Sequence, residues 1–298
     1  MRIQAVSVRC SLIPAVLAVC LVVTSCGRAD PIAPPPDHQS DAIEGAWQLP
    51  LDVLLRPEPT AEESIFDAVQ HAIGQCMSDL RFTYQPAPYI PERYPDFYGI
   101  ASADRAAATG YRPPQPPATE DSVGVGADPN TPGFQEALFG AETEAVEIRS
   151  PDNGDLLARI DPASCLGSGT ATIRPDWAEQ LQLTDQLRSL IGPSSDAADD
   201  SPVVQEAWEL WADCMSERGY AFATPWAPYY SVWPGDEPGA EEIATAVADV
   251  ECKEATNTIP IWSRELARIQ EEMLAEVIPG VLDRWVDLRD ADLRRVGA

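Results

Sequence analysis

The chain has 298 residues, and its 48 acidic and 20 basic side chains give a formal net charge of −28. A surface this acidic repels nucleic acid and anionic lipid headgroups, which excludes both as partners of the folded body. Hydrophobic residues make up 45% of the chain, so a hydrophobic core can form.

The first residues are typical of an export signal. Arg2 and Arg9 precede an apolar run from Ser11 to Val23, and no acidic residue occurs before Asp30. A positive start, a short apolar run and small residues at the cut are the marks of a secretory signal peptide. The run is too short to cross a bilayer as a helix. We therefore predict that residues 1–25 are removed.

The predicted cleavage sequence, VTSC at Val23–Cys26, resembles a bacterial lipobox. The resemblance implies that Cys26 becomes the first mature residue and carries a diacylglyceryl group on its sulfur. Two acyl chains anchor a protein stably in the lipid bilayer, whereas one does not. The expected location is the outer face of the cytoplasmic membrane. The alternative is an ordinary secretory signal that is cut near Ala29 and discards Cys26.

The composition changes again at about position 49. Residues 26–48 are rich in proline and aspartate and predict a solvated tether. We predict a first folded unit at residues 49–192 and a second at residues 193–298, and we expect the two to pack as one body.

Two stretches of the chain resemble each other. CMSDLRFTYQPAPYIPERYP begins at Cys76, and CMSERGYAFATPWAPYYSVWP begins at Cys214. In both, the cysteine is followed by Met, Ser and an acid, then by two aromatic residues, an APY triplet and an aromatic–proline pair. This agreement indicates an internal duplication. Apolar residues recur at helical spacing before each cysteine, which predicts that each cysteine ends the buried face of a helix.

The residues after each cysteine predict an arm that folds back over its helix. The arm's aromatic side chains either pack on the core or line a groove for a sugar or peptide. The candidates for a ligand-facing role are Tyr89, Tyr94, Trp226, Tyr229 and Trp233. Gly219 favours a helix end in the second copy, and Arg81 stands at that place in the first, so we expect the two ends to differ.

Two cysteines leave with the signal and Cys26 takes lipid, which leaves Cys76, Cys165, Cys214 and Cys252. An even number in an exported chain predicts two disulfides, with three possible connectivities. Each copy of the repeat is followed by one further cysteine, so we favour the pairs Cys76–Cys165 and Cys214–Cys252. A bridge between the copies, Cys76–Cys214, is the main alternative.

Several elements are predicted between and after the two copies. Short helices are expected in IASADRAAATGY and FQEALFG, and the run around Asn153-Gly154 has the signal of a β-hairpin. WAEQLQLTDQLRSLIG predicts a helix that ends at Gly192, followed by an acidic linker, PSSDAADD.

From Ala240 the chain reads as helical to its end, with Pro260 and Pro279 dividing the run. Its long apolar stripe, which begins with Ala244, Ala248, Cys252, Ala255 and Ile259, covers either the protein's own core or another protein. The fold class predicted is mainly α with a small β-hairpin: two related disulfide-stapled helix units and a long C-terminal helical segment.

The sequence offers few groups for catalysis. His38 and His71 have no Cys or His at metal-ligand spacing, so we expect no metal site, and no motif calls for a cofactor. LGSGT at Leu166–Thr170 does not fit a nucleophile elbow. Carboxylates are too abundant for a glycosidase pair to be located among them.

The lipobox, the twin CM helices and ADVECKEATN at Ala248–Asn257 together resemble a family of secreted actinobacterial lipoproteins. The resemblance implies fold and export, and it brings no catalytic residues. We therefore expect a non-enzymatic binding or interaction module, whose partner is an envelope protein or a cell-wall ligand. The alternatives are a cell-wall hydrolase that uses paired carboxylates and a solute-binding lipoprotein of a transporter.

Overall fold

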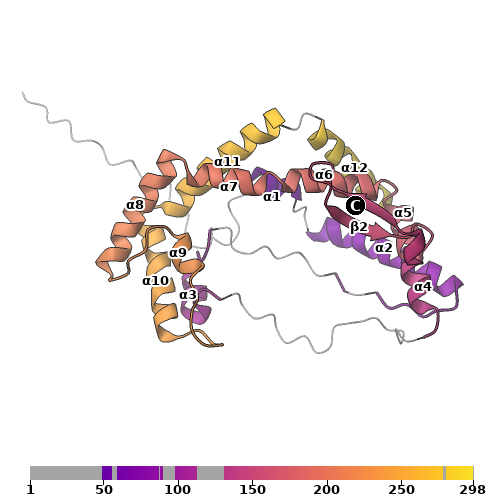
Figure 1. The fold of residues 1–298 in the computed structure, drawn as a ribbon, viewed down its shortest axis with the longest axis horizontal. Coiled ribbons are helices and arrows are strands. Elements are labelled where there is room, and N and C mark those ends of the chain that lie inside the picture. Colours follow the sequence, from indigo (N-terminus) through magenta and orange to yellow (C-terminus); the bar gives the residue numbers. More distant parts are fainter. Residues whose placement is uncertain are drawn as a thin grey trace, which may run out of the picture. The chain divides into compact units, whose positions relative to one another are not determined.

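The computed structural model describes residues 49–55, 59–86, 88–89, 98–112, 131–277 and 280–297. Residues Asp41–Ala298 form one compact unit. As predicted, the described part is mainly helical, with one antiparallel hairpin and a long C-terminal helical segment (Figure 1). It also contains the two predicted disulfides. Among these described helices, none is long and apolar enough to cross a bilayer.

The helices of the first half are α1 (Pro50–Leu55), α2 (Pro59–Asp79), α3 (Ala103–Thr109), α4 (Phe134–Phe139), α5 (Cys165–Ile173) and α6 (Trp177–Arg188). The later helices are α7 (Ile191–Asp199), α8 (Pro202–Glu217), α9 (Trp226–Tyr229), α10 (Ala240–Ala255), α11 (Thr258–Val277) and α12 (Val281–Val296). A 3-10 turn, η2 (Glu142–Glu144), precedes the strands β1 (Val146–Arg149) and β2 (Leu156–Ile160).

The hairpin lies where the Asn153-Gly154 signal predicts it. β1 and β2 pair antiparallel, with Val146 opposite Ile160 and Ile148 opposite Ala158. In the turn, the amide of Asp155 donates to Asn153 Oδ1 at 2.8 Å. This local bond is the usual way in which asparagine stabilises a tight turn.

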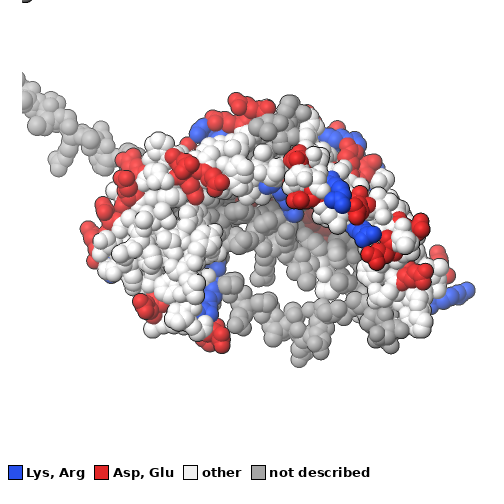
Figure 2. All heavy atoms as spheres, viewed as in Figure 1, with Lys and Arg blue, Asp and Glu red and all other residues white. Residues whose placement is uncertain are grey.

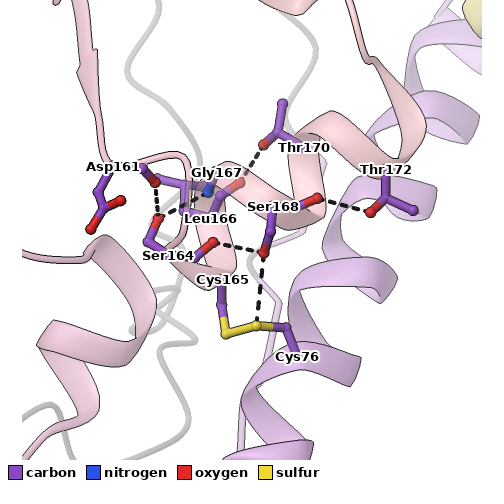
Figure 3. Close-up of a disulfide and its surroundings, with 9 residues drawn as sticks. All are labelled: Cys76, Asp161, Ser164, Cys165, Leu166, Gly167, Ser168, Thr170 and Thr172. Carbon is purple, nitrogen blue, oxygen red and sulfur yellow. Dashed lines mark hydrogen bonds between the residues drawn. A yellow bond between two sulfur atoms is a disulfide. The ribbon is translucent and has the colours of Figure 1, made fainter. Parts of the chain in front are cut away.

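The first staple joins α2 to α5 through Cys76–Cys165, with the Cα atoms 5.5 Å apart (Figure 3). Ser164 caps α5 by accepting a bond from the amide of Gly167 at 3.0 Å. Gly169 lets the two helices approach closely, because a Cβ atom there would lie 2.9 Å from the backbone nitrogen of Ile73. Sequence reasoning did not predict α5, since Gly, Ser and Thr are weak helix formers.

The second staple joins α8 to α10 through Cys214–Cys252, with the Cα atoms 5.7 Å apart. Both disulfides therefore follow the order that we favoured, and the bridge between copies, Cys76–Cys214, is wrong. The two staples are not copies of each other. Cys165 is the first residue of its helix, whereas Cys252 lies in the last turn of α10. The duplication therefore covers the first helix of each pair and not its disulfide partner.

The ends of α2 and α8 are the same structure. After α8, Gly219 donates its amide to Ser216 O at 3.0 Å and Tyr220 donates to Met215 O at 2.9 Å. After α2, Arg81 donates to Ser78 O and Phe82 to Met77 O, both at 2.9 Å. These paired bonds are a Schellman motif. The expected difference between the two ends is wrong, because Arg81 takes the left-handed backbone conformation with φ 70°.

The predicted end of α6 at Gly192 and the acidic linker after it are also wrong. α6 ends at Arg188, and residues Ile191–Asp199 form α7. Pro193 is tolerated because it stands in the first turn of α7, where its missing amide is not needed. Ser194 and Ala198 are fully buried, and α7 packs against α11.

The C-terminal run is divided near Pro260 and Pro279, as predicted. Pro260 lies in the first turn of α11, and the break falls at Asn257, whose φ is 56°. α12 begins after Gly280, which has φ 93°. Pro279 itself lies outside the described residues.

The two sequence halves exchange helices. α12 packs against α2, α5 and α6 of residues 49–192, whereas α3 packs against α10 of residues 193–298 (Figure 1). α3 belongs by sequence to the first half and by contact to the second. Residues 98–112, which contain α3, are called the strap below.

Candidate functional site

The described aromatic candidates fall on the two arms, with Tyr89 on the first and Trp226, Tyr229 and Trp233 on the second. Cys26 and Tyr94 lie outside the described residues. Tyr89 is partly buried, with its ring centroid 5.6 Å from that of Phe66 on α2. Tyr84 donates its hydroxyl to Gln70 at 2.6 Å, also on α2. The first arm therefore folds back along its own helix, as the repeat predicted.

The second arm contains the other three candidates, and all three contact the protein itself. Trp226 lies edge-on to Trp262, at 5.7 Å between ring centroids. Trp233 stacks on Tyr111 of the strap at 5.6 Å and 12°. Tyr229 meets the same Tyr111 ring edge-on at 6.3 Å. Residues 226–237 are called the aromatic loop below, and these three rings attach it to the body.

Two other side chains of the aromatic loop point to solvent. Tyr230 is 74% exposed and Val232 is 97% exposed. The Tyr230 ring rests edge-on against Tyr229, at 5.2 Å between centroids. The backbone amide of Tyr230 donates to Trp226 O at 3.0 Å, and Ser231 Oγ donates to Ala227 O at 2.8 Å. These bonds hold the exposed edge of the loop in one conformation.

Arg112 of the strap holds the far end of the aromatic loop. Its guanidinium donates to Asp236 O at 3.0 Å and to Pro234 O at 3.4 Å. The same group pairs with Glu242 at 3.2 Å, and that carboxylate also accepts the amide of Tyr111. One arginine therefore joins the strap, the loop and α10.

Beneath the strap lies a buried ion pair. Lys253, the only lysine in the chain, is 2% exposed. Its Nζ donates to Asp249 Oδ2 at 3.0 Å, to Tyr98 O at 3.1 Å and to Ile100 O at 2.9 Å. Three acceptors satisfy the three protons of an ammonium group. Lys253 therefore fastens the first residues of the strap to α10.

Asp249 completes this cluster. Its Oδ1 accepts a bond from Trp211 Nε1 at 3.0 Å, and its Oδ2 accepts one from Tyr111 Oη at 3.2 Å. Burial raises the pKa of Asp249 and lowers the pKa of Lys253, although each partner's charge acts in the opposite direction. Burial, with the charge of Asp249, also raises the pKa of Tyr111. All these groups are engaged inside the chain, which fits a structural clamp rather than a reactive site.

A second carboxylate holds the start of the aromatic loop. Asp199, the last residue of α7, accepts the indole protons of Trp262 at 2.6 Å and Trp226 at 3.1 Å. Burial raises its pKa, the two indole bonds lower it, and the nearby Asp196 and Asp200 raise it further. Both oxygens are used to position tryptophan rings.

Sequence reasoning did not single out Tyr230, Val232 or the Lys253–Asp249 pair. A usable signal existed for the pair. Asp249 and Lys253 stand four residues apart on a predicted helix, and Lys253 is the only lysine in a chain that otherwise uses arginine. No comparable signal distinguishes Tyr230 from Tyr229, because the sequence of two adjacent tyrosines does not indicate which ring is buried.

Among the described residues, no group of three His, Cys, Asp or Glu side chains is placed to hold a metal ion. No protein-family model, no curated protein and no solved structure matches the chain.

Proposed function

We propose that this protein is a lipid-anchored, non-enzymatic binding module on the outer face of the cytoplasmic membrane. The lipobox-like sequence Val23–Cys26 supports the anchor, with a diacylglyceryl group on Cys26. The two disulfides are consistent with export, because such bonds persist in oxidising compartments.

The aromatic loop is the observation that carries the binding role. It presents Tyr230 and Val232 to solvent on a backbone fixed by Arg112 and by the rings beneath it. Exposed aromatic side chains on a rigid support are the usual anchors of binding surfaces, because little conformational freedom is lost on association.

The contacts of the buried carboxylates also support a non-enzymatic role. A general acid or base must reach the proton that it transfers. Asp249 and Asp199 are instead occupied by donors of the protein, and Asp292 accepts bonds from Arg174 and Arg295. These three acids have raised pKa values mainly because of burial, which is a structural cause.

The anchor is tested by Cys26→Ser in the full-length chain. The variant should accumulate as an uncleaved precursor that takes up no fatty-acid label, whereas the wild type is cleaved and labelled. A variant that is still cleaved and still extracted only by detergent contradicts lipid anchoring at Cys26. Cys10→Ser is the matched control, because it removes a cysteine of the leader that lies outside the lipobox-like sequence.

The hydrolase alternative is tested with the purified protein and peptidoglycan. We expect no soluble fragments above the level of a heat-denatured sample. Release of fragments that is lost when one exposed carboxylate is changed to its amide would assign an enzymatic function instead.

A further inference from the structure

We propose that the outer edge of the aromatic loop, centred on Tyr230 and Val232, is the docking surface for a basic protein of the cell envelope. This inference rests on the proposed binding function and adds the surface and the chemistry of the partner.

The degree of exposure distinguishes this edge. Val232 is 97% exposed and Tyr230 is 74% exposed. Among the residues that the structure describes, the other large exposed hydrophobic side chains are between 46% and 53% exposed: Val53, Leu80, Phe139, Val146, Leu156, Val203 and Leu210. Tyr230 and Val232 are separated by one residue, so both can contact the same partner. An aromatic and an aliphatic side chain together offer the apolar centre that protein interfaces need.

Contacts within the protein itself order this edge. Trp233 donates its indole proton to Pro228 O at 3.1 Å, which closes the loop on itself. Tyr111 of the strap stacks on Trp233, and Arg112 binds two loop carbonyls. The strap is in turn fastened by Lys253. A partner therefore meets a preformed surface and does not have to order it.

Acidic side chains that follow this edge in the sequence favour a basic partner. Asp236, Glu237 and Glu241 follow Tyr230 within the loop and the first turn of α10, and all three are exposed. Arg112, the cation that binds two carbonyls of this loop, is already paired with Glu242. Arginine side chains of a partner could pair with these carboxylates and stack on the Tyr230 ring.

The overall charge disfavours other occupants. A second copy of the mature chain would bring a further charge of about −30, since Arg2 and Arg9 leave with the signal, and anionic lipid would be repelled in the same way. Acidic side chains are spread over the face seen in Figure 2 rather than confined to one patch.

Photo-crosslinking in the full-length lipidated protein tests the surface. p-Benzoylphenylalanine replaces Tyr230 in one strain and Leu156, a half-exposed residue of β2, in a control strain. We expect one protein to be crosslinked at position 230 and not at position 156, through a peptide that carries several Lys or Arg residues. Capture alone is not sufficient, so the captured protein is purified and its affinity is measured.

The affinity measurement compares three variants. Tyr230→Ser and Val232→Ser should each weaken binding about tenfold or more, because both remove buried contact area at the centre of the interface. Leu156→Ser should leave the affinity unchanged. Raising the salt from about 0.05 to about 0.5 M should also weaken binding, since the charged rim is screened. All three variants should keep the melting temperature of the wild type.

The opposing results are distinct. Crosslinking at position 230 to lipid, to glycan or to a second copy overturns the basic-protein partner. A partner captured only through position 156 overturns the surface and leaves the binding function intact. Release of cell-wall fragments by the purified protein overturns the binding function itself.

Discussion

At the scale of single residues, Lys253 is a buried cation whose ammonium protons are all hydrogen-bonded. Three acceptors surround one ammonium group, and the site is closed to water. A guanidinium would not replace it, because its five donors lie in a plane and at least two would stay unpaired among these three acceptors. This geometry explains why the only lysine of the chain stands at a buried position.

Lys253→Met should destabilise the fold by about 3–5 kcal/mol, because it leaves Asp249 buried without its partner. The double variant Lys253→Met with Asp249→Asn should recover part of the loss, since the unpaired charge is removed while the amide oxygen can still accept the indole proton of Trp211. Urea unfolding measures both. Arg268→Ala, which removes exposed ion pairs on α11, is the control and should change stability little. A Lys253→Met protein as stable as this control would show that the clamp is unimportant.

Asp199 predicts a dependence on pH. Its folded pKa lies above the ordinary value because of burial, so the folded protein binds this proton more tightly than the unfolded chain does. The contribution of Asp199 to stability is therefore fully present below the unfolded pKa of about 3.9 and is lost as the pH rises through the folded pKa.

Asp199→Asn removes this titration. The stability of the variant relative to the wild type should therefore improve as the pH is raised from about 4 to about 7. Denaturant unfolding at several pH values measures the difference. A difference that stays constant, or that changes in the other direction, would show that burial does not raise this pKa.

At the scale of elements, the two CM helices end in the same motif with different residues. Arg81 has φ 70° and Gly219 has φ 91°. The left-handed conformation costs a residue with a Cβ atom roughly 1–2 kcal/mol, and glycine avoids this cost. Part of the gain is lost again, because glycine also makes the unfolded chain more flexible.

Arg81→Gly should therefore stabilise the protein by about 0.5–1 kcal/mol, and Gly219→Ala should destabilise it by about 1 kcal/mol. A Cβ atom at Gly219 would meet no other atom within 4 Å, so the effect comes from the backbone alone. Thermal melts of the two variants provide the comparison. Equal shifts in the same direction would argue against a shared cap.

The disulfides differ in the length of chain that they close, 89 residues for Cys76–Cys165 and 38 residues for Cys214–Cys252. Loss of either bridge should cost about 2–5 kcal/mol. By loop entropy, the longer loop should cost about 0.8 kcal/mol more. The matched variants are Cys76→Ser with Cys165→Ser and Cys214→Ser with Cys252→Ser. If the variant that lacks Cys214–Cys252 is less stable than the variant that lacks Cys76–Cys165, native-state packing outweighs loop entropy.

The sequence predicted those elements whose local signals agree with their packing. The stripes of α2 and α8, the Asn153-Gly154 turn and the pairing of the cysteines are examples. α7 was missed because Gly192 and Pro193 suggest a loop, whereas burial of Ser194 and Ala198 against α11 makes it a helix. Tertiary contact decided the outcome in that case.

α10 shows the same limit for a candidate site. The predicted stripe includes Ala244 and Ala255, which are exposed, while Asp249 and Lys253 are buried. α10 is contacted by α3, α8 and α11, so more than one of its faces lies inside. A single apolar stripe cannot describe a helix that is covered on several sides.

At the scale of the whole molecule, a segment from the first half of the sequence supports the proposed surface, which lies in the second half. The strap leaves the first half, lies on α10 and supports the aromatic loop of the second half. The surface at Tyr230 therefore depends on residues from both halves. Weakening the clamp at Lys253 should loosen this surface without any change to the loop itself.

Export and lipid anchoring at Cys26 underlie every functional proposal for this protein, and the mass of the mature N-terminal peptide tests them most directly. The protein is purified from membranes with detergent and digested, and the N-terminal peptide is identified by mass spectrometry. We expect a peptide that begins at Cys26 and carries the mass of a diacylglyceryl group. A peptide that begins after Ala29, or one that still contains residues 1–25, would contradict the anchor.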